Sequence, residues 1–333
     1  MALISTVAVR RMRLALAGAA MLATALMLAA VASAQSYPVR PIRIVVPYAA
    51  GGITDILARA LGQRLGAALG QPVVIENRPG ANGQIGAEIV AHAVPDGYTL
   101  LVSADTTFVM NPHLYGTRAY DPLADFLPVS GLGISPQALV VHPSVAASSV
   151  SELIATARAS PGLTYGTFGL GSSGHLNVVL LESLTGTQFT AVHYKGAAPA
   201  LTDLIGGHIK MMIVSMGLVT QAWQAGQFKV LAVGSEKRLA QYPDVPTIAE
   251  TLPGYEAGSW YGLAAPAGTP RAIVDRLSAE TRRIFAERNF RDKLLTPNFI
   301  FSIAGTPEEF AARIKADDAK WGKVIREAGV KVE

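Results

Sequence analysis

Apolar runs and helical patterns alternate along the chain from residue 41 onward. The runs IRIVVPY (42–48), PVVIEN (72–77) and YTLLVSA (98–104) suit buried strands, and each precedes a helical pattern. This alternation favours an α/β unit with a largely parallel sheet. In the helix that begins near Asp55, apolar residues recur on one face as far as Leu69, and Gly70 with Pro72 ends the pattern. We expect that face to lie on the sheet.

A second group of strand patterns begins near Ala138. ALVVHP precedes a helical pattern over 150–159, and LTYGTF, FTAVHY, IKMMIVS and FKVLAVG follow before Pro253. SWYGLAAPAG is then typical of a strand that leads into further helices. Because no repeat, low-complexity tract or long linker separates the groups, we expect the second unit to be inserted into the first. Two crossings would then join two lobes around a cleft, with lobe 1 formed by 35–137 plus 257–333 and lobe 2 by 138–256.

Two of the last helices have recognisable starts. Thr269-Pro270 and Thr306-Pro307 each place a capping hydroxyl before a first-turn proline. Glu309 stands three residues after Thr306 and completes a capping box. We expect the closing helix to bury four large side chains, Phe310, Ile314, Trp321 and Ile325.

Residues 1–34 have the pattern of an export signal. Arg10, Arg11 and Arg13 precede a nearly uncharged apolar run, which ends at Ala32-Ser33-Ala34, a small-x-small cleavage pattern. The alternative is an uncleaved membrane anchor, because the run is about long enough to span a bilayer. We expect a signal peptide that is cleaved near Ala34, and a soluble, exported mature protein.

Charge and composition exclude several classes of protein. The 333 residues include no cysteine, so disulfide scaffolds and thiolate metal sites are excluded. The whole chain has 28 basic and 24 acidic residues, and removal of three signal arginines leaves 25 against 24, a formal charge of +1. The mature chain shows no basic stripe of the kind expected for nucleic-acid binding. Its six histidines show no metal-binding spacing, so we expect no metal.

Candidate chemistry lies at the strand-to-helix junctions, because ligands of parallel α/β sheets collect at the carboxyl ends of strands. The first junction holds Gly51 and Gly52, followed by Thr54 and Asp55 as possible helix caps. The second holds Ser103, Asp105, Thr106 and Thr107. At both junctions a ligand site and an ordinary capped turn remain open.

The third junction, 169–175, matches G-x-G-x-x-G between a strand and a helix. No acid follows about 20 residues later to hold a ribose, so we expect no dinucleotide cofactor. The hydrolase elbow G-x-S-x-G is absent, because His175 stands where a Ser173 nucleophile would need glycine. At the fourth junction Lys195 either neutralises an acidic ligand or is simply solvated. Together the junctions supply backbone N–H groups, hydroxyl groups and at most one or two cations. These groups can hold a small carboxylate by hydrogen bonds at helix N-termini. We therefore expect binding without turnover.

Several motifs, in this order, resemble the substrate-binding receptors of tripartite tricarboxylate transporters, the Bug-type periplasmic solute-binding proteins. They are YPVRPIRIVVPYAAGGITD (37–55), VVIENRPGANGQIGAE (73–88), PDGYTLL (95–101), YDPLADFLPV (120–129), YGTFGLGSSGHL (165–176), YKGAAPALTDLIGGHI (194–209) and KWGKVIREAGVK (320–331). The resemblance implies a type II periplasmic-binding fold, in which two α/β lobes close over a carboxylate. It nominates these ligand-binding residues: Gly51, Gly52, Thr54, Asp55, Thr106, Thr107, Gly171, Ser172, Ser173, His175 and Ser215.

The resemblance also implies a monomer in the periplasm and, as partners, transporter membrane subunits, which can be absent or shared. Two other functions remain as alternatives. One is an exported serine hydrolase that uses Ser172 or Ser173 with His175, and the other is a ligand-sensing receptor for a signalling partner. The sequence does not name the ligand, and Asp55 could either support an ammonium group or, as we favour, cap its helix.

Overall fold

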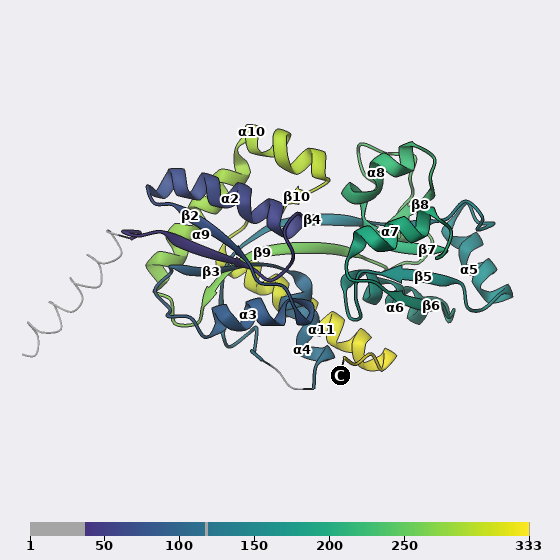
Figure 1. Ribbon diagram of the computed structural model, residues 1–333, viewed down its shortest axis with the longest axis horizontal. Coiled ribbons are helices and arrows are strands. Elements are labelled where there is room, and N and C mark those ends of the chain that lie inside the picture. The colour runs from purple at the N-terminus through teal and green to yellow at the C-terminus, as the bar shows by residue number, and fades with distance from the viewer. Residues whose placement is uncertain (1–36, 117–118, 333) are drawn as a thin grey trace, which may run out of the picture.

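A ten-stranded sheet runs through both lobes of the protein (Figure 1). The structure is a computed structural model that describes residues 37–116 and 119–332. The proposed signal peptide, 1–34, lies outside the described residues. Within them, no helix has both the length and the apolar character needed to cross a bilayer.

The bounds of the elements are as follows. The strands are β1 (Ile42–Val46), β2 (Val73–Asn77), β3 (Thr99–Ala104), β4 (Phe126–Val141), β5 (Thr164–Thr167), β6 (Thr190–His193), β7 (Met211–Ser215), β8 (Lys229–Val233), β9 (Gly258–Pro266) and β10 (Phe301–Ser302). The α-helices are α2 (Ile53–Leu69), α3 (Gln84–Ala91), α4 (Asn111–Leu114), α5 (Val150–Ala159), α6 (Ser173–Thr185), α7 (Ala197–Ile205), α8 (Met216–Gln224), α9 (Arg271–Ala286), α10 (Arg288–Phe290) and α11 (Pro307–Ala328). Short helical turns of other types are η1 (Ala81–Gly83), η2 (Thr106–Met110), η3 (Ile248–Glu250), η4 (Arg291–Leu295) and η5 (Thr296–Asn298).

Lobe 1 contains β2, β1 and β3 as parallel neighbours, with β9 antiparallel to β3. Helix α2 packs on this sheet because Leu57, Leu61 and Leu65 share one face and are completely buried. The helix ends at Gly70, which has the left-handed conformation (φ 73°) expected of a glycine stop. The predicted helix and its apolar face are thus confirmed.

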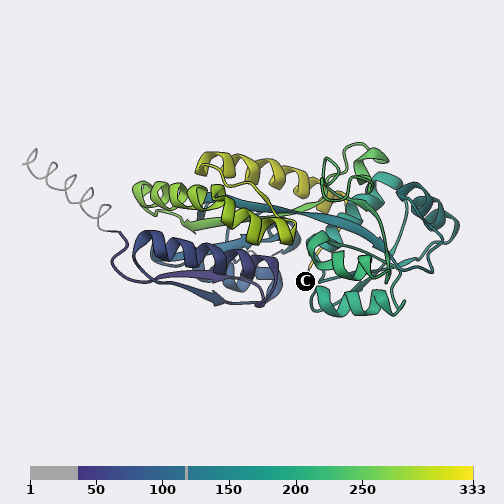
Figure 2. The same ribbon diagram turned by 90° about the horizontal axis from the view of Figure 1, so that it is seen from above.

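Lobe 2 contains β5, β6 and β7 as parallel strands, and β4 joins it by antiparallel pairing with β7 and β8. Helix α5 spans the predicted range and begins at Ser149, whose side chain accepts a hydrogen bond from the N–H of Glu152. Figures 1 and 2 show α5 to α8 gathered in this lobe, apart from α2, α3 and α9 in lobe 1. The two-lobed α/β fold expected from the sequence is therefore confirmed.

Strands β4 and β9 cross between the lobes. Pro136 of β4 pairs with Gly258 of β9, whereas the next residue, Gln137, pairs with Ser215 of β7. The sequence did not predict that β4 is one strand of 16 residues, because prolines and glycines interrupt its pattern. The register shifts near Pro128 and Gly131 accommodate them as irregularities of the ladder. The predicted lobe boundaries remain a prediction.

One predicted helix start is correct and one is wrong. Thr306 forms a capping box with Glu309, and α11 buries the four predicted side chains. Thr269 does not cap α9: its hydroxyl donates to the carbonyl of Pro266 at 2.8 Å, and Pro270 takes the N-cap position without a side-chain bond. The turn that precedes α9 therefore uses the hydroxyl that a cap would need.

Candidate functional site

The carboxyl ends of β1, β5, β6 and β7 lead into α2, α6, α7 and α8 at the junction between the lobes. Between these helix starts lies a cavity of about 550 Å³. Residues from both lobes and both crossing strands line it: Tyr48 to Thr54, Asn82, Ala104, Thr106, Gln137, Phe168, Ser172, Ser173, Lys195 to Pro199, Val214, Ser215, Leu218, Ser259 and Tyr261. The convergence of helix N-termini makes this the candidate ligand site.

The cavity brings together most of the predicted site residues. Seven of them line it: Gly51, Gly52, Thr54, Thr106, Ser172, Ser173 and Ser215. The remaining four, Asp55, Thr107, Gly171 and His175, are outside its lining and hold the loops that form it. Direct ligand contact by any of the eleven remains a prediction.

The first loop owes its shape to Gly51 and Asp55. Gly51 has φ of 89°, which favours glycine, and its N–H donates to Oδ2 of Asp55 at 3.0 Å. Asp55 is not the N-cap, which is Gly52, but the third residue of α2. It also accepts hydrogen bonds from Arg59 and Asn77, at 2.9 and 3.0 Å. Its carboxylate therefore holds the loop that contains Gly51 and Gly52 in place.

The surroundings of Asp55 keep it ionised. Burial acts to raise its pKa, but the hydrogen bonds from Arg59, Gly51 and Asn77 outweigh burial and lower the pKa overall. All three donors bind the carboxylate, so its hydrogen-bonding capacity is used within the protein. Asp55 therefore supports the loop at Gly51.

The second junction is a buried network of hydroxyl groups. Thr107 is completely buried, and its Oγ1 lies 2.6 Å from Oγ of Ser103 and 2.9 Å from the hydroxyl of Tyr48. Burial raises the pKa of Tyr48 to about 12, so this phenol stays neutral. Thr106 lies one residue earlier and lines the cavity. The two threonines thus have different surroundings, which the sequence could not separate.

Asp105 is a buried carboxyl group directly beside this network. It accepts hydrogen bonds from the N–H of Thr106 at 2.8 Å, from Oγ of Ser259 at 3.1 Å and from the N–H of Trp260 at 3.3 Å. Burial raises its pKa to about 7, although these donors act in the opposite direction. Asp105 therefore joins the end of β3 to the crossing strand β9 without entering the cavity lining.

The third junction begins α6. Ser172 is the N-cap, and its Oγ accepts a long bond (3.4 Å) from the N–H of His175. Nδ1 of His175 accepts a hydrogen bond from the N–H of Gly171 at 3.1 Å. Burial, followed by the neighbouring His193, lowers the pKa of His175 to about 4, so its imidazole is neutral at pH 7. Among the described residues, no hydrogen bond joins the His175 ring to the hydroxyl of Ser172 or Ser173.

Polar groups on the cavity wall differ in whether the protein already satisfies them. Oγ of Ser215 is bonded to Ser135 at 2.6 Å, and Oγ of Ser259 donates to Asp105. In residues 37–116 and 119–332, five polar side chains of the lining make no hydrogen bond: Thr54, Gln137, Ser173, Lys195 and Tyr261. These five groups, with the helix N–H groups, are available to a ligand.

Some lining residues escaped sequence reasoning. The sequence leaves open whether Lys195 contacts a ligand, and its place in a strand-to-helix junction is the signal that favours a contact. Gln137, Ser259 and Tyr261 lie inside the crossing strands, where an apolar pattern gives no signal for a ligand contact. Asn82 lies in the turn η1, and its Nδ2 donates across the lobes to the carbonyl of Gly171 at 3.2 Å.

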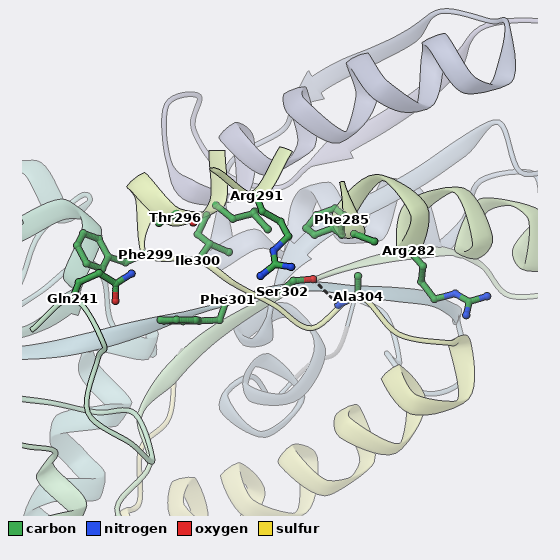
Figure 3. A pocket seen from close by; sticks show the side chains of 12 residues that line it. Gln241, Arg282, Phe285, Arg291, Thr296, Phe299, Ile300, Phe301, Ser302 and Ala304 are labelled. Carbon is green, nitrogen blue, oxygen red and sulfur yellow. Dashed lines mark hydrogen bonds between the residues drawn. The ribbon is translucent and has the colours of Figure 1, made fainter. Parts of the chain in front are cut away.

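A second cavity of about 480 Å³ lies between the end of α9, the segment from η4 to β10 and Gln241 of lobe 2 (Figure 3). Its wall combines Arg282 and Arg291 with apolar side chains that include Phe301. None of the four strand-to-helix junctions contributes to it, so it is not the candidate ligand site. No group of three or more potential metal ligands occurs among the described residues.

Comparison with known proteins gives a consistent relationship. The model of the tripartite tricarboxylate transporter family receptor matches residues 57–330. Protein BugT of Bordetella pertussis is 36% identical over 309 residues, which are 92% of this chain and 94% of that protein.

Two solved structures extend the relationship to the fold. R. palustris Rpa4515 with adipate has a TM-score of 0.81 and 38% identity, over 88% of this chain and 98% of that chain. The periplasmic binding protein BugD has a TM-score of 0.79 and 33% identity, over 89% of this chain and all of that chain. The chain belongs to the tripartite tricarboxylate transporter receptor family.

Proposed function

We propose that this protein binds a small carboxylated metabolite between its lobes and releases it chemically unchanged to a partner. The observation that carries the proposal is the cavity at the lobe junction. Helix N-termini from both lobes meet there. Of the described residues that form its lining, Lys195 is the one with a cationic side chain, and none has an acidic side chain. Such a site favours an anion. The adipate in the Rpa4515 structure is a ligand of this class.

The serine hydroxyl groups at the start of α6 are better suited to binding a ligand than to attacking it. A serine nucleophile needs an adjacent base, and that base needs a group that orients it. Nδ1 of His175 instead accepts a hydrogen bond from the N–H of Gly171, while Ser172 caps α6. These contacts give the hydrolase alternative no support. An esterase activity that a single Ser172→Ala or Ser173→Ala substitution abolishes would reinstate it.

The proposed place of action is the periplasm. In this proposal residues 1–34 direct export and are removed near Ala34, and the mature monomer delivers its ligand to the membrane subunits of a tripartite transporter. The relative BugD is a periplasmic binding protein. A sensor would use the same cavity with a different partner, and crosslinking in the native envelope separates the two possibilities.

Titration calorimetry and thermal unfolding test the proposal. The probes are adipate, citrate, glutamate and benzoate, and adipamide is the uncharged control for adipate. A true ligand present at 100 times its Kd adds about 2.7 kcal/mol to the apparent free energy of unfolding. We expect at least one acid to bind and adipamide to fail. If the refolded protein, free of retained ligand, binds no organic acid, the proposal is wrong.

A further inference from the structure

Gln137 occupies an unusual position in the cavity. It lies on β4 at the residue where the strand exchanges β9 for β7 as its partner, and so it belongs to the crossing itself. The residue is only 2% exposed, and it lines the cavity. The other polar groups in the lining come mainly from loops and helix starts. Gln137 instead contributes from β4, one of the two strands that connect the lobes.

The Gln137 amide has no partner in the protein. No hydrogen bond joins either of its polar atoms to any of residues 37–116 or 119–332, and Oε1 is buried. Nearby hydroxyls do not serve it, because Ser215 is bonded to Ser135 and Ser259 to Asp105. A buried polar group without a partner destabilises a fold, because the hydrogen bonds that it made to water in the unfolded chain are not replaced. Since buried polar groups are normally satisfied, this glutamine calls for an explanation other than stability.

We propose that the side-chain amide of Gln137 is a ligand-binding group, and that its Nε2 donates a hydrogen bond to an oxygen of the bound acid. This inference rests on the proposed function. Because Oε1 is sealed off, Nε2 is the amide atom that the cavity can reach, and an NH₂ group recognises acceptors such as carboxylate or carbonyl oxygens. Because β4 belongs to both lobes, the ligand then contacts the crossing as well as the two sets of helix starts.

The substitution Gln137→Met tests this role. Methionine has a similar length and no group that needs a partner, so the unliganded variant should unfold at the same or a higher temperature than the wild type. The variant loses a hydrogen bond to a charged group. Its affinity for the acid that the wild type binds best should therefore fall by about 10- to 100-fold. Stability and affinity thus move in different directions, which a merely structural role would not produce.

Two further variants sharpen the test. Gln137→Glu keeps the size but replaces the donor with a carboxylate, so acid binding should fall below that of Gln137→Met. Gln227→Met changes a glutamine on the exposed surface of lobe 2 and should leave binding unchanged. In the ¹⁵N-labelled wild type, the side-chain NH₂ signals that are absent from Gln137→Met should shift when the acid is added.

The outcomes separate this inference from the proposed function. If the wild type binds none of adipate, citrate, glutamate and benzoate, the proposed function fails and this inference falls with it. If the wild type binds an acid and Gln137→Met binds it equally well, the inference alone is wrong. It is also wrong if Gln137→Met loses unliganded stability in proportion to its loss of binding.

Discussion

Gly51 and Gly52 are neighbours in sequence but meet different physical demands. Gly51 has the positive φ that side chains rarely adopt, and its N–H is held by Asp55. Gly52 has φ of −78°, which any residue can adopt, and an added Cβ would lie 3.9 Å from the nearest backbone oxygen, that of Ala49. The backbone therefore tolerates a side chain at Gly52, and only the cavity loses space.

Gly52→Val should impair ligand binding much more than folding. Because Gly52 lines the cavity, we expect the added side chain to crowd the ligand and the helix N–H groups. We expect at least a tenfold loss of affinity by calorimetry, with an unfolding free energy within about 1 kcal/mol of the wild type.

Gly51→Ala is the contrasting variant. It forces a side chain into left-handed backbone, at a cost of roughly 1–2 kcal/mol. Its loss of stability should therefore exceed that of Gly52→Val. Equal losses of stability and binding in Gly52→Val would mean that Gly52 serves only the turn.

At the scale of elements, the strand-to-helix junctions could be predicted from the sequence, and the strands that cross between the lobes could not. Apolar runs followed by helical patterns located β1, β3, β5 and β7, and therefore the loops that carry Gly51, Thr106, Ser172 and Ser215. The long strand β4 was missed because Pro128, Gly131 and Pro136 look like strand ends in sequence. Gln137 was missed because its importance depends on what surrounds it in three dimensions.

Asp105 ties the end of β3 to β9, and it makes that link sensitive to pH. Its folded pKa of about 7 lies above the ordinary value of 3.8, so the folded state binds the proton more tightly than the unfolded state does. The resulting stabilisation is fully present below about pH 4 and is lost as the pH rises to 7. The free energy of unfolding changes with this one group by at most about 1.4 kcal/mol per pH unit.

Asp105→Asn should remove this contribution, because asparagine stays neutral throughout. Urea unfolding at several values between pH 4.5 and 8 should show that the wild type loses stability relative to the variant up to about pH 7, and no further above it. Acids such as Asp55, whose pKa is lowered, contribute the opposite slope in both proteins, so the difference isolates Asp105. Parallel curves would refute the assignment.

For the whole molecule, the relative position of the lobes depends on contacts away from β4 and β9. Asn82 in lobe 1 donates to the carbonyl of Gly171 in lobe 2 at 3.2 Å. Asn111 in turn supports Asn82, since its Nδ2 donates to the Asn82 carbonyl at 3.0 Å. Asn82 also lines the cavity. The lobe contact and the ligand site therefore share one side chain.

Asn82→Asp should accelerate ligand release. Aspartate tolerates the left-handed conformation (φ 53°) but lacks the donor, and its charge repels the Gly171 carbonyl. We expect the dissociation rate to rise about five- to tenfold, with a smaller change in the association rate. Stopped-flow fluorescence measures both. Asn289→Asp, an exposed site on α10, adds the same charge as a control. An unchanged dissociation rate would show that Asn82 does not hold the lobes.

The paired crossing strands also decide how the molecule carries mechanical load. Between Phe126↔Pro266 and Pro136↔Gly258, β4 and β9 are hydrogen-bonded side by side, so the chain of lobe 2 leaves and re-enters through one antiparallel ribbon. Tension applied at residues 37 and 332 is therefore carried along the chain of lobe 1, and the chain of lobe 2 enters the load-bearing path only after that ribbon has unzipped.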